Sequence, residues 1–143
     1  MATRAIIAKL DENDIQAIYS HSDNYLEHTG KILDQHYANE DKVDELLAHG
    51  DVSIIDENIG VKIDFNDYKL RAENKQCLFY ARDRGEKYKQ AEQLKDESAL
   101  LKHAFEYYDV NVVYLYAFGS WYVYDYYNSN QFEELEEVLY VPL

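Results

Sequence analysis

The segment VNVVYLYAFGSWYVYDYY, residues 110–127, carries the clearest structural signal in the chain. It contains two runs rich in β-branched and aromatic residues, residues 110–118 and 121–127, around a Gly119-Ser120 turn. Such runs favour strands, and a tight glycine-containing connection between them is typical of a β-hairpin. The segment therefore predicts a C-terminal hairpin. Tyrosines alternate along it and form two rows: Tyr114 and Tyr116 on one face, and Tyr122, Tyr124 and Tyr126 on another.

The N-terminal residues show a second strand pair. Residues 3–10 and 15–21 alternate in the period of a strand, and the Asp-Glu-Asn-Asp sequence at 11–14 is typical of a turn. We therefore expect an N-terminal hairpin as well. Residues 77–81 predict a central strand, whereas residues 51–75 lack a clear period and predict a loop region with one strand at most.

Helices are expected between and after these strands. Three capping positions predict three helices: Asp23 or Asn24 for residues 25–37, Asn39 for residues 40–49, and Asp96 for residues 96–108. The last of these could begin as early as Lys87. Asn130, followed by Glu133 three residues later, predicts a capping box for a short C-terminal helix. The sequence thus predicts one α+β domain over residues 1–143, with a mainly antiparallel sheet and helices packed on one of its faces.

Charge is the strongest compositional signal. The chain has 143 residues, 28 acids, 14 Lys or Arg residues and a net charge of −14. Residues 1–61 carry 13 acids and 4 bases, residues 62–102 carry 8 acids and 10 bases, and residues 103–143 carry 7 acids and no base. Such a chain should repel nucleic acid and anionic membranes and attract basic protein surfaces. Its 15 tyrosines and 5 phenylalanines argue against a disordered acidic tail.

Several classes of protein are disfavoured by what the sequence contains. Cys77 is the only cysteine, so an intramolecular disulfide and a cysteine-rich zinc site are excluded, and its apolar neighbours predict an inert buried thiol. No apolar run has the ~18 residues of a membrane span, and the first residues do not resemble a secretory signal. We therefore expect a soluble protein of the cytoplasm.

Signals for catalysis or metal binding are weak. His21, Asp23 and His28 are of the residue types that bind zinc, iron or manganese, but their spacing matches no ligand motif, and a strand-to-helix corner explains them equally. The chain lacks nucleophile, phosphate-loop and dinucleotide motifs. We expect no cofactor, no metal and no catalytic residue. A small hydrolase or metal-dependent enzyme resting on His21 and Asp23 stays a secondary alternative.

One basic segment, YARDRGEKYKQ at residues 80–90, suggests a different function. Arginines beside aromatic rings can hold a phosphorylated small molecule, and the candidate ligand-binding residues are Tyr80, Arg82, Arg84 and Lys87. Asp83 and Glu86 lie among them, so a self-neutralising loop is a second interpretation. A contact with the acidic ends of another copy is a third, which leaves a homodimer open.

Acidic and tyrosine residues at both ends of the chain define the leading candidate surface. Side chains three or four positions apart on a helix lie ~5–6 Å from one another, a charge density comparable with the phosphates of a nucleic acid. Tyrosine is favoured at recognition surfaces because it gives a large contact at little entropic cost. The candidate residues are Tyr124, Asp125, Tyr126, Glu133, Glu134, Glu136 and Glu137 at the C-terminal end, and Asp41, Asp44 and Glu45 as a second patch.

Parts of the chain resemble small uncharacterised proteins of tailed phages and prophages. The resemblance covers most of the chain and rests on His21-Ser22-Asp23-Asn24-Tyr25, Gly30-Lys31-Ile32-Leu33, His36-Tyr37, Gly50-Asp51, residues 80–86 and the aromatic hairpin. In that family the corner typically reads His-Trp-Asp-Gly-Tyr. Here Ser22, Asn24 and Leu26 stand in place of the usual tryptophan, glycine and proline. Small acidic phage proteins of this kind often inhibit bacterial defence, so the resemblance implies that context.

These observations give three hypotheses. The first is a phage-encoded, non-enzymatic inhibitor of a restriction or CRISPR system, which uses its acidic, tyrosine-rich surface to occupy the nucleic-acid-binding cleft of a basic host protein. The second is a protein that sequesters a nucleotide immune signal through residues 80–87. The third is the small enzyme at His21 and Asp23.

Overall fold

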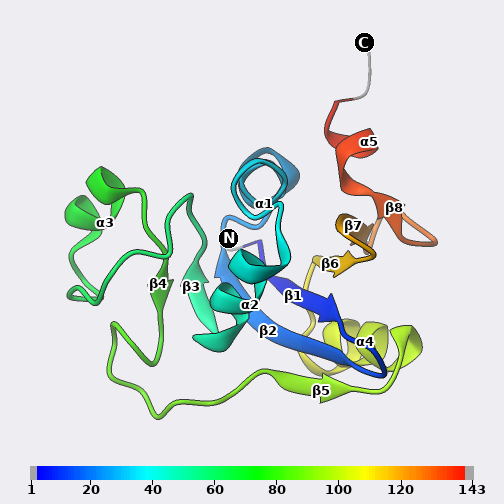
Figure 1. Ribbon diagram of the computed structural model, residues 1–143, viewed down its shortest axis with the longest axis horizontal. Coiled ribbons are helices and arrows are strands. Elements are labelled where there is room, and N and C mark those ends of the chain that lie inside the picture. The colour runs from blue at the N-terminus through cyan, green and yellow to red at the C-terminus, as the bar shows by residue number, and fades with distance from the viewer. Residues whose placement is uncertain (1–2, 141–143) are drawn as a thin grey trace.

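Both predicted hairpins form in the computed structural model, which describes residues 3–140 (Figure 1). At the N-terminal end, β1 (Ala5–Leu10) pairs antiparallel with β2 (Ile15–Ser22). Near the C-terminal end, β6 (Val112–Ala117) pairs antiparallel with β7 (Ser120–Asp125). The two hairpins join through a parallel pairing of β1 with β6, in which Ala5 lies opposite Val112. The centre of the sheet is therefore built from the two ends of the chain.

Shorter strands extend this centre to an open sheet of order β4-β3-β2-β1-β6-β7-β8. On one side, β3 (Val52–Ile54) runs parallel to β2, and β4 (Leu78–Phe79) runs antiparallel to β3. On the other side, β8 (Glu133–Glu134) pairs antiparallel with β7 and forms the edge. β5 (Glu92–Leu94) pairs with the first half of β2. The predicted single α+β domain with a mainly antiparallel sheet is confirmed.

Helices cover both faces of the sheet rather than one. One face is covered by α1 (Lys31–His36), which follows a π-helical turn at Leu26–Gly30, by α2 (Glu40–Ala48) and by α5 (Leu135–Leu139). The opposite face is covered by α4 (Glu97–Lys102), which continues into a π-helical turn at His103–Tyr107. The burial pattern of β1 explains the difference, because Ile6 and Ile7 point to opposite faces and both are fully buried.

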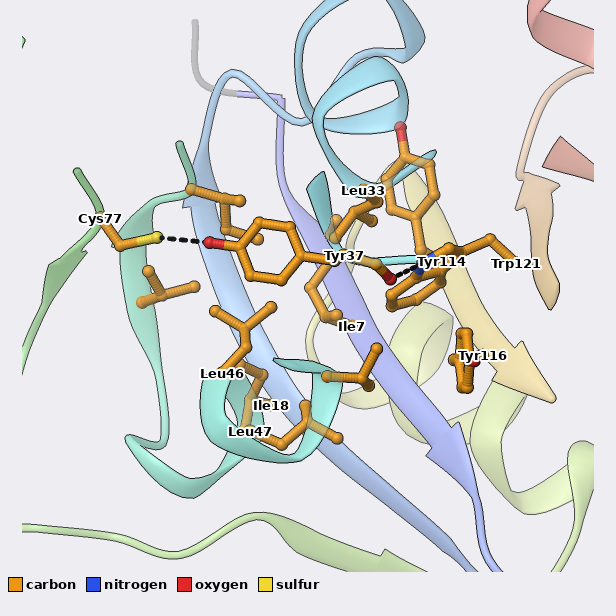
Figure 2. Packing of buried hydrophobic residues seen from close by; sticks show 14 of the residues in the cluster. Ile7, Ile18, Leu33, Tyr37, Leu46, Leu47, Cys77, Tyr114, Tyr116 and Trp121 are labelled. Atoms are coloured by element: carbon orange, nitrogen blue, oxygen red, sulfur yellow. Dashed lines mark hydrogen bonds between the residues drawn. The ribbon is translucent and has the colours of Figure 1, made fainter. Parts of the chain in front are cut away.

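Two aromatic side chains connect the layers of the core (Figure 2). The fully buried Tyr37, which follows α1, donates a hydroxyl hydrogen bond to the Asp56 carbonyl at 2.8 Å and lies 3.5 Å from the Cys77 sulfur. Trp121 Nε1 donates to the Tyr37 carbonyl at 2.8 Å. Burial raises the pKa of the Cys77 thiol, as suits an inert side chain. The described chain leaves no buried side-chain polar atom without a partner.

Four local predictions were wrong, each for a physical reason. The turn of the C-terminal hairpin is Phe118-Gly119, one residue earlier than expected, because Ala117 pairs with Ser120. Residues 133–134 form β8 rather than the first turn of a helix, so the expected capping box of Asn130 does not form. The other two concern elements without a buried apolar stripe: α3 (Tyr68–Asn74) lies in a region predicted to be a loop, and β5 lies where the sequence allows an early start of the following helix.

Candidate functional site

Four glutamates of β8 and α5 form an exposed surface that we call the C-terminal acidic edge, namely Glu133, Glu134, Glu136 and Glu137. They surround Leu135, whose side chain is fully buried in the core. β8 is hydrogen-bonded to β7, with Glu134 opposite Tyr122 and Glu133 opposite Val123. The expected helical row that began at Glu133 is therefore replaced by a strand followed by a helix. The four carboxylates project from backbone that is fixed on both sides of a core residue.

Within residues 3–140, the glutamates of this edge form no ion pair with a base. Across residues 3–140, the ion pairs shorter than 4 Å involve carboxylates up to Asp109, and none after it. Glu134 and Glu136 also line a surface groove of about 330 Å³, together with Asp34 and the buried Trp121. The structure thus adds Asp34 from α1 to the acidic surface, a residue that the sequence did not single out because it lies a hundred positions away.

Asp125 is engaged within the fold. Its carboxylate accepts hydrogen bonds from the Tyr127 amide and the Asn128 side chain, each at 3.0 Å. This arrangement is a turn in which an aspartate side chain caps the backbone two residues on. Asp125 therefore shapes the turn after β7, and its two oxygens are already hydrogen-bonded in the free protein.

The two tyrosine rows differ in burial. Tyr114 and Tyr116 are buried in the core, where burial raises the pKa of Tyr114. On β7, Tyr124 is half-buried, with its ring centroid 5.5 Å from those of Phe105 and Phe132. Tyr126 is 54% exposed. Of the two expected anchors, Tyr126 is therefore the more accessible, whereas Tyr124 contacts Phe132 just before the acidic edge.

The second acidic patch is partly neutralised. Lys9, whose side chain is 5% exposed, lies 2.6 Å from Asp44, 2.9 Å from Glu40 and 3.2 Å from Asp11. Burial alone would lower the pKa of Lys9, but hydrogen bonds to these three carboxylates outweigh it and raise the pKa above its ordinary value. Asp44 is therefore engaged within the fold. Asp41 and Glu45 are exposed and take part in none of the ion pairs of the described residues.

The structure does not bring the four candidate residues of the basic segment together. Arg82 points inward, where its guanidinium donates to the carbonyls of Gly60 and Cys77 at 3.1 and 3.2 Å and to the buried Asp83 at 3.0 Å. Arg84 pairs with Glu86 at 3.4 Å. These contacts leave only two of the four candidates, Tyr80 and Lys87, around one cavity.

That cavity is small and electrically balanced. Its volume is about 130 Å³, below the roughly 300–1,000 Å³ of typical small-molecule sites. Lys87 and Lys89 line it together with the acids Asp51 and Glu86.

The strand-to-helix corner is held by internal hydrogen bonds. His21 Nδ1 lies 2.7 Å from the Tyr19 hydroxyl, whereas His28 Nε2 lies 3.0 Å from the Ile55 carbonyl. Asp23 adopts a left-handed backbone with φ of 58°, which fits the aspartate of a tight corner. The two histidines and Asp23 do not converge on one point, and residues 3–140 contain no group of three or more His, Cys, Asp or Glu side chains arranged to hold a metal ion.

Asn24 is the centre of this corner. Its fully buried side chain donates to the carbonyls of Thr3 and Ser20 and accepts from the hydroxyls of Ser20 and Thr29, and its own carbonyl accepts from the Tyr114 hydroxyl at 2.7 Å. All of these hydrogen bonds are made within the chain. Asn24 therefore joins the first hairpin, through Ser20, to the last one, through Tyr114.

Comparisons with known proteins leave the site to be interpreted from its own geometry. No protein-family model matches the chain, and no curated protein or solved structure is significantly similar to it. None of the helices between residues 3 and 140 has the length and apolar character needed to cross a bilayer.

Proposed function

We propose that the protein is a phage-encoded, non-enzymatic inhibitor of a bacterial defence system of the restriction or CRISPR type. It acts in the bacterial cytoplasm by placing its acidic edge in the nucleic-acid-binding cleft of a basic host protein. One observation carries the proposal: the carboxylates of Glu133, Glu134, Glu136 and Glu137 are exposed, unpaired within the described chain and fixed to the sheet.

A fixed array of carboxylates suits this role for two reasons. Unscreened negative charge steers a basic partner toward the surface and speeds association at low ionic strength. A partner also loses less by ordering groups whose backbone is already held, here by the pairing of β8 with β7 and by the burial of Leu135. Flexible acidic tails lack this second advantage.

Protection of the sheet edge explains only part of the arrangement. β8 lies at the edge of the sheet, and charged residues on edge strands oppose aggregation through unpaired backbone groups. Glu133 and Glu134 serve that purpose. Glu136 and Glu137 lie in α5, whose backbone groups are not offered to another strand, so edge protection does not account for them.

A matched pair of variants tests the proposal. The first replaces the four glutamates of the acidic edge by glutamine. The control replaces four other exposed glutamates that take part in none of the described ion pairs, namely Glu12, Glu73, Glu92 and Glu106. Both variants change the net charge by the same amount, so they separate the position of charge from its total.

The assay measures phage plating on bacteria that carry single restriction or CRISPR systems, with the protein expressed from a plasmid. We expect the wild type and the control to restore plating on at least one defended strain and the edge variant to fail. With the purified effector of that strain, inhibition of DNA binding should weaken from 50 to 300 mM salt. Equal behaviour of the two variants, or no protection of any strain, would overturn the proposal.

Sequestration of a nucleotide signal is the less supported function, because Arg82 and Arg84 are engaged elsewhere and the remaining cavity is small. Calorimetry with cyclic and ADP-ribose-type nucleotides separates the two functions. A charge mimic gives no binding heat with these compounds, whereas a nucleotide-sequestering protein does.

A further inference from the structure

The turn between β6 and β7 contains an unusual residue. Phe118 and Gly119 have φ values of 54° and 78°, and Ala117 pairs with Ser120, so the turn has two central residues with left-handed backbone. Such turns strongly prefer asparagine, aspartate or glycine at the first position, and a bulky residue there is strained. Phe118 is also 88% exposed, the highest exposure among the large apolar residues of the described chain.

No contact of Phe118 within the described chain offsets its strained backbone or the exposure of its ring. A buried phenylalanine stabilises a protein through the hydrophobic effect, but the ring of Phe118 stays in water. Asparagine in its place would satisfy the turn better and avoid the exposed ring. Backbone strain and exposed aromatic surface that coincide at one residue of a rigid hairpin point to a contact made outside the chain.

An apolar groove lies beside Phe118. It has a volume of about 430 Å³ and is lined by the half-buried or buried side chains of Leu10, Ile15, Leu115, Tyr122 and Phe132. These residues belong to the sheet face that α4 covers, at the end that α4 leaves open. The groove can therefore accept an apolar side chain, with Phe118 as one wall.

Charge identifies the kind of partner. The exposed Asp96 and Glu97 line the groove with Lys95 as the single base, and neither acid takes part in an ion pair of the described residues. At the other side, Tyr122 of the groove lies opposite Glu134 in the pairing of β7 with β8, so the acidic edge adjoins the groove. A second copy of this chain would bring another 14 net negative charges to the contact, which opposes self-association.

We propose that this groove and Phe118 bind an apolar side chain carried on a basic, amphipathic segment of the partner protein. The inference rests on the proposed function and adds a specificity element to it. Charge alone attracts any basic protein, whereas an apolar side chain flanked by lysines or arginines selects one kind of segment. The buried aromatic contact at the centre and the charged rim around it match the usual arrangement of interaction hot spots.

The test uses two synthetic peptides of 14 residues and equal charge. The first combines leucine and lysine in an amphipathic helical pattern, and the second has serine in place of each leucine. Fluorescence anisotropy at 50 and 300 mM salt measures their affinities for the full chain. We expect the leucine peptide to bind at least tenfold more tightly than the serine peptide, with the difference retained at the higher salt.

Phe118→Asn is the decisive variant, because Asn-Gly is the preferred sequence for this turn and the fold should be as stable as before or more so. We expect it to bind the two peptides equally, with an unchanged or raised Tm. Tyr68→Ser, which removes a ring that is 61% exposed on the distant α3, is the control and should keep the tenfold difference. A leucine preference that survives Phe118→Asn, or is absent from the wild type, overturns the inference.

Two further outcomes separate this inference from the proposed function. Replacement of the four glutamates of the acidic edge should weaken both peptides by a similar factor and leave the leucine preference intact. If the edge variant loses the leucine preference, the groove at Phe118 is not the source of that preference and the inference is refuted. If the edge variant binds both peptides as tightly as the wild type, the proposed role of the acidic edge is refuted. Sedimentation equilibrium tests the remaining occupant: a dimer that Phe118→Asn dissociates would assign the groove to a second copy and overturn the inference.

Discussion

Leu135→Ala should detach the acidic edge from the sheet without unfolding the domain. Leu135 is fully buried and lies between the two residues of β8 and the remainder of α5. Apart from it, this segment is held by the short β7–β8 pairing and by partly buried residues of α5 such as Leu139, which approaches Gly30. One side chain therefore supplies a large part of the local stability.

The magnitude follows from the size of the segment. Truncation of a fully buried leucine to alanine costs about 2–5 kcal/mol where the surrounding structure stays folded. A two-residue strand and a five-residue helix open more easily than the ~5–15 kcal/mol that unfolds a whole domain. The loss at Leu135 should exceed the stability of the segment, so the segment opens and the measured global loss stays below about 2 kcal/mol.

Hydrogen exchange of peptides covering residues 130–140 and residues 5–10 measures the two regions separately, and urea denaturation gives the global value. Leu46→Ala is the matched control, because Leu46 is equally buried but lies in the last turn of α2. It should cost the full 2–5 kcal/mol and speed exchange throughout. Uniform exchange in Leu135→Ala, or a global loss equal to that of Leu46→Ala, would refute the reasoning.

Four further substitutions test other contacts. Gly30→Ala should raise the free energy of unfolding by about 0.4–1 kcal/mol in thermal or urea denaturation, because the backbone at Gly30 is right-handed and the added methyl group would meet its nearest neighbours at 3.4 Å. Gly50→Ala should lower the free energy of unfolding, because φ at Gly50 is 77° and the methyl group would lie 2.5 Å from the Lys89 carbonyl oxygen. Tyr37→Phe should cost about 1 kcal/mol in the same assay through the lost bond to Asp56. The pKa of Lys9 is higher in the folded chain than the ordinary 10.5, so its stabilisation is complete below pH 10.5 and declines above it. The stability difference between wild type and Lys9→Met, followed by urea denaturation from pH 8 to 12, should therefore stay constant up to about pH 10.5 and shrink above it.

The elements that the sequence predicted well are those whose pattern is local. The alternation of β1, β2, β6 and β7 identified both hairpins, and the Asn39 and Asp96 caps marked the starts of α2 and α4, where each side chain accepts the expected backbone hydrogen bond. By contrast, α3 contains no buried residue, so it has no apolar stripe to reveal it. β8 could not be predicted either, because its conformation depends on β7 rather than on its own residues.

The features of the candidate site likewise divide into those that a local pattern predicts and those that depend on residues distant in the sequence. The unpaired state of the four glutamates could be anticipated from the absence of bases after Lys102, but the strand that carries Glu133 and Glu134 could not. The engagement of Asp44 by Lys9 and the inward turn of Arg82 could not, because both depend on residues brought together from different elements. The exposure of Phe118 depended on a one-residue shift of the turn, which moved the ring from a strand to the tip of the hairpin.

The parallel pairing of β1 with β6 has a consequence for biosynthesis. Ala5 meets Val112 only after most of the chain has left the ribosome, and translation adds roughly 5–20 residues per second. Until then β1 and β2 can pair with each other and β2 with β3 and β5, but the edge of β1 that receives β6 stays open, and Ile6 and Ile7 lack part of their final cover. Such distant pairings slow folding, so the nascent chain spends seconds as a target for chaperones before its central strands can meet.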